Sequence, residues 1–167
     1  PSGGGTDLFW EAGVGDSSGP GSVGSWIPAY VYKDNAWISS PFNNANWISV
    51  FSDSAHEENV EIFFRNRFYL NSSVTPGQFS LEMKFFADNS VHEIYVNGAP
   101  QGIYHPAILP QNPSSPYNYR GFSAGNEVVI SLTNDWKECE NEIIVHVKSG
   151  PGKVGFLAQN AINCYEA

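Results

Sequence analysis

Residues 60–70, VEIFFRNRFYL, alternate apolar and polar side chains and decide the fold class. The even positions are apolar except for Asn66, whereas Glu61, Arg65 and Arg67 stand at odd positions. In an extended chain, successive side chains point to opposite faces, so this alternation places the apolar set on one face. The stretch is therefore predicted to form a half-buried β-strand.

The same period of two recurs on both sides of this strand. Residues 79–85 alternate in the same way, and residues 91–96 end at Asn97-Gly98, a pair typical of the type I′ turn of a β-hairpin. No long stretch keeps apolar side chains at helical spacing. Further strands are predicted at residues 26–32, 36–39, 47–51, 101–104, 128–132, 143–147 and 154–162, with a polar turn over 133–141.

Many short strands without helices predict an all-β fold. We expect a jelly-roll β-sandwich of two antiparallel sheets with roughly 8–10 strands. The 167 residues suit one domain, spanning 1–167, with a single sizeable core. Residues 1–8, PSGGGTDL, are glycine-rich and are expected to form a flexible N-terminal segment.

The charge balance excludes several classes of partner. Eight Lys and Arg residues against 17 Asp and Glu residues give a net charge of −9, which repels phosphate backbones and anionic lipid headgroups. No apolar run approaches the roughly 20 residues that span a bilayer. We therefore expect neither nucleic-acid binding nor membrane insertion. Charged residues at 15% and aromatic residues at 14% are typical of a secreted or cell-surface protein, so an extracellular location is predicted.

The two cysteines, Cys139 and Cys164, allow two interpretations. A disulfide between them closes a loop of about 25 residues and stabilises the fold by roughly 3 kcal/mol. Two buried thiols are the alternative. An oxidising extracellular compartment favours the disulfide, which is our prediction.

Four segments resemble the galactose-binding-domain-like jelly rolls, which accompany many bacterial glycosidases and surface proteins. These segments are FRNRFYL at 64–70, FADN at 86–89, IYVNG at 94–98 and ENEIIVHV at 140–147, where Glu140 replaces the usual glycine. The resemblance covers about residues 60 to 160. It implies a jelly roll that acts as a non-catalytic carbohydrate-binding module of a bacterial secreted or surface protein. A role in adhesion belongs to the same expectation.

The Pro-rich connection over residues 105–122 is the best candidate for a glycan site. Sugar recognition needs flat aromatic faces beside directional hydrogen-bonding groups, and this segment has both. Its prolines stiffen it, which lowers the entropy lost on binding. A loop that only covers the sandwich edge is the alternative. The predicted ligand contacts are His105, Asn112, Tyr117, Asn118, Tyr119 and Arg120, together with Trp136 outside this segment.

Many modules of the resembled family carry a structural calcium ion. The resemblance therefore implies Ca²⁺ held by oxygen atoms of the acidic loops, and Asp88 and Asp135 are the candidate ligands. No EF-hand spacing organises these carboxylates.

Catalysis has no support in the sequence. The four histidines are scattered, and neither HExxH nor GxSxG is present, so we predict that the chain is not an enzyme. The alternative to glycan binding is a structural or protein-binding domain of a multidomain adhesin, which contacts neighbouring domains and takes no small ligand. The fold alone is compatible with that alternative, which requires no ligand-binding side chains.

Overall fold

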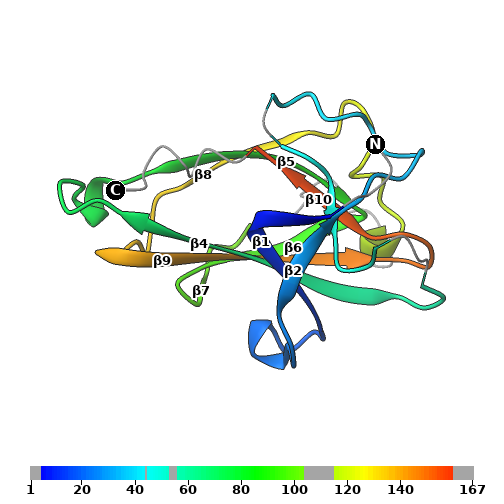
Figure 1. Cartoon of the computed structure of the whole chain (residues 1–167), viewed down its shortest axis with the longest axis horizontal. Helices are drawn as coiled ribbons and strands as arrows, with labels where there is room; N and C mark the ends of the chain where they lie inside the picture. The colour runs from blue at the N-terminus through cyan, green and yellow to red at the C-terminus, as the bar shows by residue number, and fades with distance from the viewer. Residues whose placement is uncertain (1–4, 44, 53–55, 104–114, 160–167) are drawn as a thin grey trace.

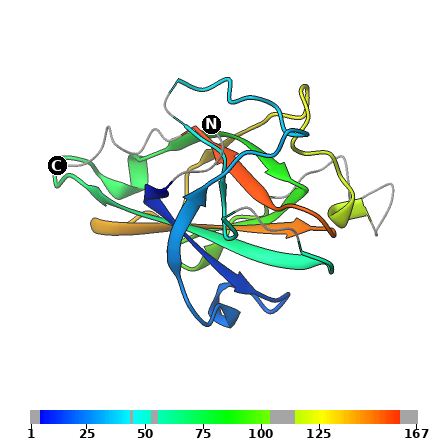
Figure 2. The same ribbon diagram turned by 45° about the vertical axis from the view of Figure 1, so that its right-hand side comes forward.

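A computed structural model describes residues 5–43, 45–52, 56–103 and 115–159. Ten strands form one sheet, which curls so that β5, β8 and β10 lie over β4 and β9 in Figures 1 and 2. The strands are β1 (Thr6–Gly15), β2 (Ile27–Val31), β3 (Ile48–Ser49), β4 (Val60–Leu70), β5 (Leu81–Asp88), β6 (Ser90–Val96), β7 (Ala99–Pro100), β8 (Val128–Leu132), β9 (Cys139–Ser149) and β10 (Gly155–Ala158). Three short 3₁₀ turns, η1 (Pro20–Ser22), η2 (Pro76–Gln78) and η3 (Ser115–Tyr117), interrupt the connections.

The all-β prediction is confirmed, but the two separate sheets expected from the sequence are joined here. The strand order is β7-β6-β9-β4-β1-β2-β3-β10-β5-β8, and the neighbouring strands pair antiparallel. Strands β1, β2 and β3 connect the arm that contains β4 and β9 to the arm that contains β5 and β10. The sheet is therefore continuous from one face of the core to the other.

Strand β4 forms where the sequence predicts it, and its longest partner is β9. The two strands pair over their whole length, from Val60 opposite Ser149 to Leu70 opposite Cys139. Because β9 follows β4 to its end, it begins at Cys139, inside the segment predicted as a polar turn. The hairpin turn after β6 is confirmed, since Asn97 and Gly98 both adopt positive φ, at 49° and 85°.

Aromatic rings fill the space between the two arms. Phe156 on β10 is fully buried, and its ring centroid lies 5.5 Å from those of Trp10 and Phe64 and 5.9 Å from that of Phe85. These rings come from β1, β4, β5 and β10. The curled sheet therefore closes around one main core.

Other predicted elements differ from the structure. Strand β1 was not predicted, and it begins at Thr6, within the segment expected to be flexible. Residues 36–39 form no strand; the Trp37 N–H donates to the Asp34 carbonyl in a turn. The return after Gly98 is the two-residue β7, and residues 101–103 of the predicted return form no strand. In the described part of the chain, no helix has the length and apolar character to cross a membrane.

Candidate functional site

The structure brings together four of the seven predicted ligand-contact residues. These four residues are consecutive: Tyr117 ends η3, and Asn118, Tyr119 and Arg120 follow it. Asn118 and Arg120 are exposed, and the two tyrosines are partly buried. The Arg120 guanidinium lies 5.3 Å from the Phe122 ring centroid. His105 and Asn112 lie outside the described residues.

This segment packs closely on the corner between β5 and β6. The Asn89 side-chain amide donates to the Tyr119 carbonyl at 2.8 Å, and the Ser90 hydroxyl donates to the Pro116 carbonyl at 2.9 Å. A Cβ atom on Gly150 would lie 2.3 Å from the Tyr117 carbonyl oxygen, so the close approach requires glycine there. The described part of the loop is therefore held by its backbone, as expected of a covering loop, while its exposed side chains stay candidates for ligand contact.

Trp136 lies apart from that segment and belongs to the core. Its ring is 8% exposed and packs edge-on against Phe68 and Phe79, with centroids 5.6 and 5.0 Å away. Its indole N–H donates to the Leu132 carbonyl at 3.0 Å. Little of this ring is available to a ligand, because it closes one end of the core.

The two candidate calcium ligands lie far from each other. Asp88 precedes β6, whereas the backbone carbonyl of Asp135 accepts a hydrogen bond from Asn97, which follows β6. Strand β6 is about 20 Å long, so the two carboxylates do not share one ion. In the ranges that the structure describes, no three His, Cys, Asp or Glu side chains gather as a metal site.

Asp88 is tied into the interior of the protein. It is 8% exposed and accepts hydrogen bonds from the Trp37 indole N–H at 2.6 Å and from the Ser149 hydroxyl at 3.2 Å. Burial raises the pKa of its carboxyl to about 6, although these two hydrogen bonds oppose the shift. The side chain therefore links β5, β9 and the turn that carries Trp37.

A second buried titratable group, His146, lies on the other face of β9. It is 1% exposed, it stacks on Phe63 with centroids 4.1 Å apart, and burial lowers its pKa to about 4. The neutral ring donates from Nε2 to Glu61 at 2.7 Å, while Nδ1 has no partner among the described residues. The other Glu61 carboxylate oxygen accepts from the Ser17 hydroxyl at 2.7 Å. The pair of His146 and Glu61 is mostly buried. Through its hydrogen bond from Ser17, Glu61 attaches the loop after β1 to the sheet.

A further candidate site, which was not predicted from the sequence, lies at the start of β1. Between Thr6, opposite Tyr30, and Glu11, opposite Pro28, strand β1 carries extra residues, which form a bulge over Asp7–Trp10. One Asp7 carboxylate oxygen accepts from the backbone N–H groups of Phe9 at 2.7 Å and Trp10 at 2.9 Å. The side chain of Asp7 therefore holds the bulge in shape.

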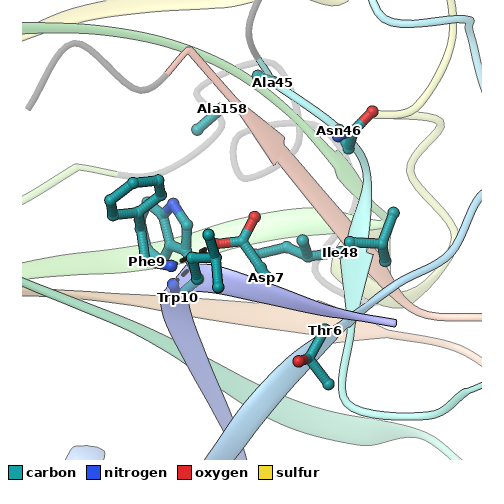
Figure 3. A pocket seen from close by; sticks show the side chains of 10 residues that line it. Thr6, Asp7, Phe9, Trp10, Ala45, Asn46, Ile48 and Ala158 are labelled. Carbon is teal, nitrogen blue, oxygen red and sulfur yellow. Dashed lines mark hydrogen bonds between the residues drawn. The ribbon is translucent and has the colours of Figure 1, made fainter. Parts of the chain in front are cut away.

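A half-open hollow of about 250 Å³ lies beside this bulge, and we name it the bulge hollow. Figure 3 shows the Phe9 ring and the Asp7 carboxylate rising from β1 beneath Ala158, with the second Asp7 oxygen turned away from the backbone. Phe9 is 40% exposed, and Asn46 is also exposed. The hollow is lined by Thr6, Asp7, Leu8, Phe9, Trp10, Val31, Ala45, Asn46, Ile48 and Ala158.

The bulge hollow combines the groups that sugar recognition uses. An exposed ring offers a face for C–H stacking, and a carboxylate, a hydroxyl and an amide offer directional hydrogen bonds. One signal in the sequence points to it: the run Leu8-Phe9-Trp10 breaks the alternation of a strand, so at least one of its apolar side chains must face solvent.

Cys139 is exposed at the first position of β9, and Cys164 lies outside the described residues. The disulfide stays a prediction. We expect thiol labelling of the unreduced, denatured protein to modify neither cysteine, because a disulfide consumes both thiols. Reduction before labelling is the control and should expose two thiols per chain. Two labelled thiols without reduction would refute the pairing.

A comparison with protein-family models found no match, and a comparison with curated proteins found no significant match either.

Proposed function

We propose that the chain is a non-catalytic carbohydrate-binding module of an extracellular protein and that glycan binds at the bulge hollow. The observation that carries the proposal is the exposed Phe9 ring beside the Asp7 carboxylate on one half-open hollow. The hollow is half-open and lies at the surface. A jelly-roll classification and a bacterial source form part of the same proposal and rest on the resemblance of the four segments. The aromatic-rich, charge-poor composition supports the secreted or surface location.

Residues of β1 line the bulge hollow together with residues at or next to the ends of β2, β3 and β10. Asp7 fixes the bulge through two backbone N–H groups, and Trp10 anchors it from below in the core. A site whose shape is set before binding loses less entropy when the ligand arrives. This support favours the bulge hollow over side chains that project singly into solvent, such as Asn118.

The first test is a broad glycan array, probed once with calcium and once with chelator. We expect a hit that survives chelation, because the groups at the bulge hollow bind sugar without an ion. A hit that chelator abolishes would reassign binding to a calcium ion held by the acidic loops. The absence of any hit would contradict the proposal.

Phe9→Ala locates the site on whichever glycan the array identifies. We expect about a tenfold loss of affinity by calorimetry, since a stacked ring contributes on the order of 1.4 kcal/mol. The melting temperature should hardly change, because Phe9 is 40% exposed. Tyr69→Ala, which removes another exposed aromatic ring, is the matched control and should bind normally. Normal binding by Phe9→Ala together with weak binding by Tyr119→Ala would move the site to residues 117–120.

One observation favours the second candidate, a protein-binding domain of a multidomain adhesin. Leu8 is 89% exposed beside Phe9, and exposed apolar neighbours are typical of protein contacts. Leu8→Asp tests this candidate. It should abolish association with a neighbouring protein domain, because it places a charge in the exposed apolar contact. Unchanged association would contradict the second candidate.

A further inference from the structure

Three hollows on the surface adjoin one another, because each shares lining residues with the next, and we name the row that they form the path. Asp7–Trp10 line the bulge hollow and also a second hollow of about 490 Å³ with Glu11, Pro28 and Arg67, here the Pro28 hollow. Arg67 in turn lines a third hollow of about 370 Å³ with Asn97, Gly98, Lys137, Glu140, Asn141 and Glu142, here the Asn97 hollow. The path therefore extends from the bulge to the β6–β7 turn.

Strand register shows that this path crosses the strands. Arg67 on β4 pairs with Glu142 on β9, and the Asn97 N–H after β6 donates to the Glu142 carbonyl at 2.9 Å. On the other side of β4, Asn66 pairs with Trp10 on β1. Strands β1, β4, β9 and β6 are consecutive neighbours, so the path from β1 to β6 covers three strand spacings, or about 14 Å. That length exceeds a single sugar ring.

The side chains along the path determine which ligands it suits. Four carboxylates, those of Asp7, Glu11, Glu140 and Glu142, line the Pro28 and Asn97 hollows, against the two cations Arg67 and Lys137. The whole chain also carries a net charge of −9. A polyanionic chain would be repelled, whereas the hydroxyl groups of a neutral chain can donate to carboxylates and accept from cations.

We infer that the module binds an internal stretch of a linear, uncharged polysaccharide, which crosses β1, β4 and β9 from the bulge hollow to the Asn97 hollow. This inference rests on the proposed glycan function. Phe9 and Asp7 hold one end of the stretch, and Arg67, which lines both of the other hollows, holds its middle. The Arg67 side chain is 47% exposed and keeps donors available beside its 3.6 Å ion pair with Glu142.

The test is a calorimetric titration with neutral linear oligosaccharides of the array-positive type, from the disaccharide to the hexasaccharide. We expect affinity to rise with chain length and then level off once the path is filled. Arg67→Ala should weaken the hexasaccharide by about tenfold, as expected when a charged hydrogen-bond donor is lost, and leave the disaccharide unaffected. Lys84→Ala removes a cationic side chain on β5, outside the path, and should bind all lengths normally.

The possible outcomes separate this inference from the proposed function. Equal affinity for all lengths would overturn the extended path while leaving a single-sugar module. A length dependence that persists in Arg67→Ala, or stronger binding of a uronic-acid chain of equal length, would also overturn it. Failure of every length to bind would remove the proposed function itself. Thermal melting of Arg67→Ala and Lys84→Ala checks that neither change unfolds the protein.

Discussion

Phe156→Ala should lower the free energy of unfolding by about 3–5 kcal/mol, the range for emptying a large aromatic site in a core. Phe156 is fully buried on β10, and it touches rings from three other strands, Trp10, Phe64 and Phe85. Because these rings belong to both arms of the curled sheet and to the strand that joins them, little can collapse into the space. Urea unfolding followed by tryptophan fluorescence measures the loss.

A surface substitution in the same fold provides the control. Val129→Ala removes an aliphatic side chain that is 54% exposed on β8, and its effect should stay within about 0.5 kcal/mol. If Phe156→Ala also cost less than about 1 kcal/mol, the two arms would not share a core around this ring. The arrangement of the curled sheet around one shared core would then be wrong.

The strands that follow one simple pattern could be predicted from the sequence. Strand β4 has the predicted bounds, and β8 does as well, because apolar side chains at nearly every second position establish a period of two in each. The Asn97-Gly98 turn was also predictable, since its positive φ angles are a local property of two residues. These features need no knowledge of partners distant in the chain.

Strand β1 could not be predicted, because its pattern is interrupted by a feature that depends on tertiary pairing. The bulge at Asp7–Trp10 places consecutive apolar residues against different surroundings, with Leu8 exposed and Trp10 buried. What fixes this arrangement is pairing with β4, more than fifty positions later, where the buried Asn66 amide donates to the Phe9 carbonyl. Alternation alone favours a loop here.

The candidate site residues illustrate the same limit. Trp136 lies within the predicted polar turn and was predicted to contact a ligand, but its burial depends on Phe68 and Phe79, which are distant in the chain. Asp88 was interpreted as a metal ligand in an acidic turn, although Trp37, 51 positions earlier, donates to it in the interior. Sequence identifies polar and aromatic residues near turns, whereas only the folded sheet decides which of them face solvent.

The buried groups Asp88 and His146 should have opposite effects on stability between pH 4 and 6. The pKa of Asp88 is raised from 3.8 to about 6, so the stability it provides is present at low pH and is lost as the pH rises through this range. The pKa of His146 is lowered from 6.5 to about 4, so its contribution is present at high pH and is lost as the pH falls. In this range the folded state holds its proton on Asp88, and the unfolded state holds it on His146. The two contributions to the pH slope therefore cancel.

Removing one group at a time should reveal both slopes. Asp88→Asn keeps the shape of the side chain without its charge, and it should make stability rise more steeply with pH than in the parent, by up to about 1.4 kcal/mol per pH unit. At neutral pH the variant should be more stable by as much as about 3 kcal/mol, because it no longer buries an ionised carboxylate. His146→Gln, which can still donate to Glu61, should shift the slope by a similar amount in the opposite direction.

Urea unfolding of the parent and both variants across this pH range measures the slopes directly. His92, whose ring contacts His146 at 5.0 Å and whose pKa is also lowered by burial, is present in all three proteins, so differences from the parent largely remove its contribution. The double variant should recover a slope near that of the parent, because one group of each sign is absent. If Asp88→Asn lost stability at neutral pH, the hydrogen bonds from Trp37 and Ser149 would outweigh the cost of burying the charge, and the pKa of the Asp88 carboxyl would not be raised in the folded protein.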